Sequence, residues 1–209
     1  MPEFDLKTDL QKLMDLYPKL RYIPDTHKMS GDIDLFDSDG RYVETFTIRL
    51  EIPRNYPFAF PLFFETNNRF PHTPERHFNG NDSCCVCSLQ EMDLESSKGI
   101  TLVRYMKKYG LAFLANQIHF ETKGKWANGE YDHDAEGILQ FYRELLPRFD
   151  EIKIAELLKQ IADEKTSVRE VSDVEHLDSK ALKTLRALSL ERILEDILYI
   201  DLLKDRLQY

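Results

Sequence analysis

Apolar side chains recur at helical spacing at the start of the chain. Leucine, methionine and tyrosine follow one another at intervals of three and four residues until Tyr17, and Pro18 ends the run. The apolar positions are Leu6, Leu10, Leu13, Met14 and Tyr17. We therefore expect an amphipathic helix at the N-terminus.

The pattern then changes to alternation of polar and apolar residues. Residues 31–36 and 41–52 both alternate, and between them 37–40 read Asp-Ser-Asp-Gly, a tight-turn sequence with a glycine for a positive φ. Another apolar run, 62–64, follows a proline-rich turn. These segments predict an antiparallel meander of four strands after the helix.

The periodic spacing of apolar residues is weaker in the middle of the chain. Residues 65–99 hold few periodic apolar positions, so we expect an ordered, irregular loop of the kind that usually carries function. Helical spacing returns from Ile100 to Ile118, and a shorter helix is expected over 137–146 before Pro147. Residues 126–136 read as a loop.

The last sixty residues have a different composition. They predict a helix over 151–163, a charged linker over 164–179 and one long amphipathic helix over 180–207. The leucine and isoleucine stripe of that helix either packs in a helical hairpin or binds a partner. We predict an α+β protein with a domain at 1–150 and a helical extension at 151–209.

Charge and cysteine usage narrow the class of protein. The formal net charge is −9 and the isoelectric point is near 5.2, which argues against a nucleic-acid or anionic-membrane surface and favours protein partners. The charged N-terminus is unlike a signal peptide, and we find no apolar stretch long enough to span a membrane. All three cysteines fall within 84–87, which favours reduced thiols in the cytoplasm over a disulfide framework.

Several motifs in this order are similar to those of ubiquitin-conjugating enzymes. Residues 53–61 read Pro-Arg-Asn-Tyr-Pro-Phe-Ala-Phe-Pro directly after an alternating strand, and 64–66 read Phe-Glu-Thr. His77-Phe78-Asn79 then precedes the cysteines, with phenylalanine where that family usually has proline. The tryptophan that usually follows the catalytic cysteine in eukaryotic members is missing.

Bacterial relatives of that family resemble the chain more closely. They share an Arg-His-x-Asn element, found here at 76–79, and a later pattern matched by Gly124-Lys125-Trp126, Gly129-Glu130 and His133, although Asp134 stands where a glycine is expected. The resemblance covers about residues 10–147. It implies a ubiquitin-conjugating fold and a bacterial conjugation pathway, such as one of antiviral defence.

The resemblance also implies a chemistry. A cysteine accepts a ubiquitin-like protein from an activating enzyme as a thioester and passes it to an amine, for which a thiol is both a good nucleophile and a good leaving group. Asn79 suits the role of an uncharged donor to the developing oxyanion. His77 belongs to the same element. The implied partners are the modifier, the activating enzyme and a deconjugating protease, and no cofactor is implied.

The identity of the nucleophile depends on the alignment. Cys87 lies ten residues after His77, as in the eukaryotic pattern, whereas Cys85 lies eight residues after it, as in the shorter bacterial pattern. We favour Cys85, keep Cys87 as the rival and expect Cys84 to pack in the interior. In an extended segment Cys85 and Cys87 share one face and Cys84 takes the other.

Other interpretations stay open. The cysteines, with His72 and His77, contain zinc ligand types, although their spacing is poor for a tetrahedral site. They are otherwise buried thiols without chemistry, or the domain is an inactive module that binds the modifier.

The sequence also leaves open the roles of several other side chains within or near these motifs. Glu130 and His133 are candidates to orient the substrate lysine, and Asp82 to orient or deprotonate it, but each is also an ordinary loop residue. Trp126 reads as an anchor for its loop, and His119, inside an apolar helix, reads as structural.

Overall fold

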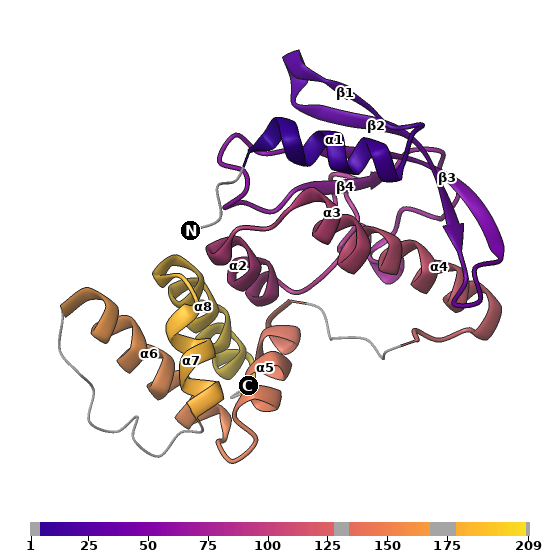
Figure 1. The fold of residues 1–209 in the computed structure, drawn as a ribbon. Coiled ribbons are helices and arrows are strands. Elements are labelled where there is room, and N and C mark those ends of the chain that lie inside the picture. The colour runs from indigo at the N-terminus through magenta and orange to yellow at the C-terminus, as the bar shows by residue number, and fades with distance from the viewer. Residues whose placement is uncertain (1–4, 128–133, 168–178, 208–209) are drawn as a thin grey trace. The chain divides into compact units, whose positions relative to one another are not determined.

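The fold is α+β, with an N-terminal helix, a four-stranded antiparallel sheet and helices in the C-terminal part, as predicted (Figure 1). We describe it from a computed structural model of residues 5–127, 134–167 and 179–207. Among these residues no helix is both long and apolar enough to cross a membrane. The chain forms two compact units: a sheet unit (1–87 and 98–129) and a helical unit (88–97 and 130–209).

The sheet unit begins with α1 (Leu6–Leu16) and continues through the four strands. Asp5 caps α1 by accepting hydrogen bonds from the backbone N–H groups of Lys7 and Thr8 at 3.3 and 3.0 Å. The strands are β1 (Arg21–Ile23), β2 (Lys28–Phe36), β3 (Tyr42–Glu51) and β4 (Leu62–Glu65), with short 3-10 turns η1 (Pro24–Thr26) and η2 (Pro74–Arg76).

The strands pair in sequence order, β1-β2-β3-β4, each antiparallel to the next. Gly40 closes the β2–β3 turn with φ of 76°, the conformation expected of its glycine. One face of β3 is buried through Phe46, Ile48 and Leu50, which are at most 1% exposed. In β2, Ile33 and Leu35 are likewise buried. The predicted alternation is therefore confirmed except at the start of β3, where Tyr42 and Val43 are exposed.

A buried carboxylate ties α1 to distant parts of the sheet unit. Asp9 is 8% exposed and accepts hydrogen bonds from the Tyr56 hydroxyl and, at 2.7 Å, from the backbone N–H of Leu102. Tyr56 lies in the proline-rich turn and precedes a cis peptide bond to Pro57. The turn is thereby linked both to α1 and to the start of the helix that begins at Leu102.

One helical path with a π turn follows. It runs through α3 (Leu102–Tyr105), the π turn η3 (Met106–Gly110) and α4 (Leu111–Lys123), where a helix from Ile100 to Ile118 was predicted. Gly110 permits close packing here, because a side-chain carbon at this position would lie 3.1 Å from the Met106 sulfur and 3.2 Å from the Phe63 ring. The path thereby packs tightly on β4.

The helical unit contains five helices among the described residues. They are α2 (Leu89–Lys98, ending one residue beyond the unit), α5 (Asp134–Leu145), α6 (Glu151–Ser167), α7 (Ser179–Ala187) and α8 (Leu190–Leu207). α8 packs against α5 and α6 around an apolar core with Leu158, Leu185 and Ile193 at its centre.

Two sequence predictions for this unit are wrong. Residues 89–98, expected to belong to an irregular loop, form α2, whose buried side chain is the polar Gln90 rather than an apolar residue. The single helix expected over 180–207 is broken at Ser189, whose hydroxyl caps α8 by accepting from the N–H of Arg192 at 3.1 Å.

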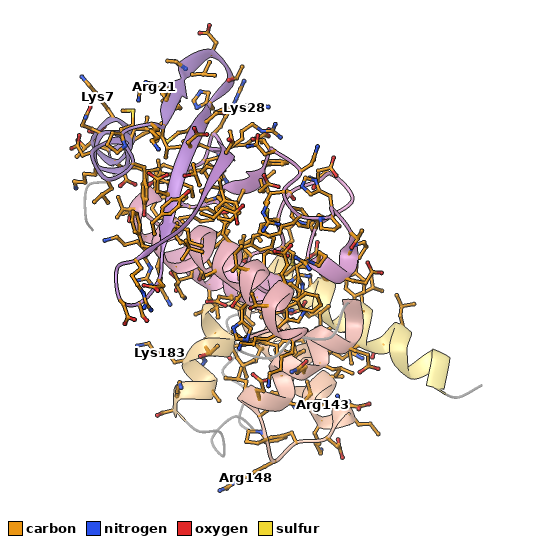
Figure 2. The ribbon with its side chains drawn as sticks, turned by 90° about the vertical axis from the view of Figure 1, so that its right-hand side faces the viewer. Lys7, Arg21, Lys28, Arg143, Arg148 and Lys183 are labelled. Carbon is orange, nitrogen blue, oxygen red and sulfur yellow. The ribbon has the colours of Figure 1, made fainter. Side chains whose placement is uncertain are left out.

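The units do not follow the chain in two simple blocks. α2 and α5 both precede residue 150, yet they pack with the C-terminal helices. The domain boundary at residue 150 stays a prediction. The two packed units of the structure have other limits, as given above. Basic side chains are spread over both units: Figure 2 shows Lys7, Arg21 and Lys28 on the sheet unit and Arg143, Arg148 and Lys183 on the helical unit.

Candidate active site

The cysteines lie at the end of a small hairpin that the His77-Phe78-Asn79 element begins. Phe78 and Cys84 form an antiparallel bridge. On either side of it, the N–H of Asn79 donates to the Ser83 carbonyl at 2.8 Å and the N–H of Cys85 donates to the His77 carbonyl at 2.7 Å. This pairing explains how a short polar turn brings the asparagine element and the cysteines together.

Cys84 anchors the hairpin in the sheet unit. Its N–H donates to the carbonyl of Phe63 in β4 at 2.7 Å, and the residue is 5% exposed. Burial, the largest influence, raises the pKa of the Cys84 thiol far above its ordinary value. A thiol that is buried and stays protonated does not serve as a nucleophile. Cys84 is therefore a packing residue, as predicted.

Cys85 is the exposed cysteine of the three. Its sulfur lies 3.9 Å from the carbonyl oxygen of Cys87, and desolvation by the surrounding chain raises the pKa of its thiol. The thiol is therefore accessible but not activated in advance. That suits attack on an already activated acyl group better than attack on an amide.

Cys87 is half-buried and lies closer to the interior. Tyr105 of α3 is fully buried, and burial, followed by the charges of Cys87 and Cys84, raises the pKa of its phenol well above the ordinary value. Its hydroxyl has no hydrogen-bond partner among the described residues. Cys87 is thus the second thiol near the surface, with an apolar ring system behind it.

The Asn79 side chain is held within the hairpin. Its amide nitrogen donates to the Ser83 hydroxyl at 2.9 Å, and that hydroxyl donates to the Asn81 side-chain oxygen at 2.7 Å. Asn79 and Cys85 are both exposed, whereas the bridged residues Phe78 and Cys84 are buried. Ser83, 2% exposed, was missed in the sequence because a serine in a polar turn gives no signal of burial.

His77 and Arg76 hold the hairpin in place. His77 has a left-handed backbone (φ of 55°), and its ring meets the Trp126 ring edge-on at 4.7 Å. Arg76 donates to the Gln117 side chain of α4 at 2.8 Å, and Gln117 returns a bond of 2.6 Å to the Arg76 carbonyl. Trp126 also packs on Phe120, so it is an anchor, as predicted.

The remaining candidates are distributed as follows. Asp82 occupies a left-handed turn position with its side chain 74% exposed, and its carboxylate lies 3.6 Å from the His72 ring. His72 stacks on Phe78 at 4.1 Å, on the interior side of the hairpin rather than beside Cys85. Gly129, Glu130 and His133 lie outside the described residues.

The zinc interpretation gains no support from the geometry. In the described part of the chain, no group of three or more histidine, cysteine, aspartate or glutamate side chains is arranged to hold a metal ion. His72 contacts carboxylates, with the Glu65 oxygen at 3.6 Å from its ring, and Glu65 itself accepts from the backbone N–H groups of Asn67 and Arg69. These side chains brace the turn after β4.

Comparisons with known proteins assign no chemistry to this site. No family model matches the sequence, and neither a curated protein nor a solved structure is significantly similar to the chain. The arrangement itself offers an accessible thiol at Cys85 and an exposed amide donor at Asn79 in the same hairpin, with the buried Phe78 and Cys84 anchoring it. Such a site is able to carry an acyl group on sulfur and to stabilise an oxyanion.

Proposed function

We propose that this protein carries a ubiquitin-like protein as a thioester on Cys85 and transfers it to an amine. The observation that carries the proposal is the short hairpin in which the bridged residues Phe78 and Cys84 are buried while Cys85 and Asn79 are both exposed. The order of the sequence motifs also supports the proposal, because it resembles the order found in ubiquitin-conjugating enzymes.

The first step is thiol exchange. The Cys85 sulfur, as thiolate, attacks the carbonyl carbon of a thioester held by an activating enzyme; a new C–S bond forms, and the enzyme's own thiolate leaves. The two thioesters have similar energies, so the step needs positioning more than activation. The raised pKa of Cys85 lowers the fraction of thiolate at neutral pH, so the step depends on positioning of the incoming thioester, and the departing thiolate can take up the proton that Cys85 loses.

The second step is aminolysis. A neutral lysine amine attacks the same carbonyl carbon, the oxygen becomes an oxyanion, and the C–S bond to Cys85 breaks to give an amide, a thiolate and a proton for solvent. In this step the Asn79 amide turns from Ser83 and donates to the oxyanion. Before and after the step, the Asn79 amide donates to the Ser83 hydroxyl, which keeps it in place.

The fold and pathway belong to the same proposal. We infer a ubiquitin-conjugating fold from α1 through α4, since the helix, the meander and the proline-rich turn precede the cysteine hairpin in that family's order. The partners would be the modifier, an activating enzyme and a deconjugating protease of a bacterial conjugation pathway. A reducing cytoplasm would keep the three free cysteines as thiols.

The test is formation of an adduct that thiols destroy. The protein is incubated with a candidate modifier, its activating enzyme and ATP, and separated by mass with and without reductant. Wild type and Cys87→Ala are expected to form the adduct, and Cys85→Ala is expected to lose it. Retention of the adduct in both single variants would assign the thioester elsewhere.

The alternative from another class is a module that binds the modifier without chemistry. It is favoured by the raised pKa of Cys85 and by the engagement of Asn79 with Ser83. If no adduct forms while the modifier still binds, and Cys85→Ala leaves its affinity unchanged, the binding module is the correct interpretation.

A further inference from the structure

Helix α8 is apolar on two opposite sides. Ile193 and Ile200 are fully buried in the core of the helical unit. Leu194, Leu198 and Leu202 follow at intervals of four residues, 52%, 60% and 51% exposed. Residues at this spacing lie on one face of a helix, so the three leucines form a continuous row, here called the α8 stripe.

The stripe is larger than the scattered exposure that surfaces normally show. Tyr199, 43% exposed, adjoins it, so four large apolar side chains gather on two turns of one helix. Single exposed leucines need no explanation, whereas a contiguous row bordered by charges is typical of an interaction site.

Among the side chains of α8 that the structure describes, the exposed charges beside the stripe are acidic. Glu191 and Glu195 lie on the same face and are exposed, and the Glu195 side chain is 50% exposed. Arg192, which pairs with Glu195 at 2.7 Å, is only 9% exposed and also pairs with the buried Asp196. The cation is therefore drawn inward while the carboxylates face outward.

These charges decide between two occupants. In a parallel pair of α8 helices from two copies, Glu191 and Glu195 would meet their own equivalents. In an antiparallel pair centred on Leu198, Glu195 would meet Asp201, which already pairs with Lys159 at 3.0 Å. Among the described side chains, both arrangements set carboxylates together, whereas a basic partner would complement Glu191 and Glu195.

We propose that the α8 stripe is a docking surface for a partner protein's amphipathic helix that carries lysine or arginine beside its own apolar row. The leucines supply the apolar contact and Glu191 and Glu195 select the charge. This surface lies in the helical unit and does not depend on the thioester chemistry.

The test uses the full-length protein and two synthetic probes. Both are amphipathic helical peptides of about eighteen residues, or five turns, with the same leucine row. Lysines flank the row in one peptide and glutamates in the other. Binding is followed by fluorescence anisotropy, with circular dichroism to verify that each protein variant keeps its helices.

Wild type is expected to prefer the lysine peptide. Leu198→Gln, which removes one exposed apolar contact, is expected to weaken that binding by about tenfold. The matched control Leu16→Gln, at a leucine of α1 that is also about half exposed, is expected to leave it unchanged. Glu191→Lys is expected to reduce the preference for lysine over glutamate.

Two results would overturn the proposal. One is lysine-peptide binding that Leu198→Gln and Leu16→Gln affect equally, which would indicate attraction to the net charge alone. The other is a wild-type dimer in sedimentation that Leu198→Gln dissociates, which would make a second copy the occupant.

Discussion

At the scale of single residues, the three adjacent cysteines have three different environments. Alternation predicted that Cys84 faces inward and that Cys85 and Cys87 face outward, and the structure buries Cys84 and exposes Cys85. The sequence did not predict that Cys87 is half-buried, because its surroundings depend on how α3 packs beside it, and α3 begins well beyond the cysteines in the chain. Ser83 was missed for the same reason: burial of a polar side chain depends on tertiary packing.

The reactivity of Cys85 should reflect its desolvated thiol. Because only the thiolate is alkylated, a raised pKa predicts slow alkylation at neutral pH and a rate that continues to rise above about pH 8.5, the ordinary thiol value. The measurement is the rate of iodoacetamide alkylation against pH in Cys87→Ala, located by mass spectrometry. Free glutathione is the reference, and an inflection below that of glutathione would contradict the assignment.

Asn79 should matter for the second step and not for the first. In Asn79→Ala the thioester is expected to form normally, whereas discharge to free lysine slows by about two to three orders of magnitude, as for loss of one oxyanion donor. A single-turnover chase measures both rates. Ser83→Ala, which removes the partner of the Asn79 amide, is expected to have a smaller effect on discharge.

Among the helices and strands, hydrophobic periodicity correctly located the ones whose buried face is apolar. α1 and the β2–β3 hairpin were predicted closely because leucines, isoleucines and a tight-turn glycine mark them. α2 was missed because it is held by polar contacts: Gln90 donates to both oxygens of Asp196 at 3.0 Å, and Asp93 accepts from the N–H of Ser189 at 2.6 Å.

The buried carboxylate of Asp196 joins three helices and should be measurable as stability. It accepts from Gln90 of α2, Tyr142 of α5 at 2.6 Å and Arg192 of α8 at 3.0 Å. Tyr142→Phe removes one donor to a fully buried charge, and we expect a loss of about 1–3 kcal/mol in the free energy of unfolding.

Urea denaturation measures this loss. Tyr199→Phe, at an exposed tyrosine of α8, is the control and is expected to change stability by less than about 0.5 kcal/mol. Equal effects of the two variants would mean that the network does not stabilise the helical unit.

For the whole molecule, the hydrophobic pattern predicted the α+β class but not how the chain divides into packed units. α5 lies before residue 150, yet its Ile138, Leu139 and Tyr142 are buried among residues of the helical unit. The division drawn at 150 followed a change in composition, which does not reveal long-range packing.

A shortened chain should show this dependence. Residues 1–150 alone would expose Ile138, Leu139 and Tyr142, so we expect that fragment to aggregate, whereas a chain ending at 207 stays monodisperse. Size-exclusion chromatography with light scattering distinguishes the two. A monomeric, folded 1–150 fragment would show that α5 does not need the later helices.

The central claim is that Cys85 is the acyl carrier, and replacement of its sulfur by oxygen tests it most directly. With the activating enzyme, a candidate modifier and ATP, Cys85→Ser is expected to form an oxyester that survives reductant but is cleaved by alkali. Tandem mass spectrometry should locate the modifier on residue 85. An alkali-labile, reductant-resistant adduct in Cys87→Ser instead, with Cys85→Ser still forming a reductant-sensitive one, would contradict the account.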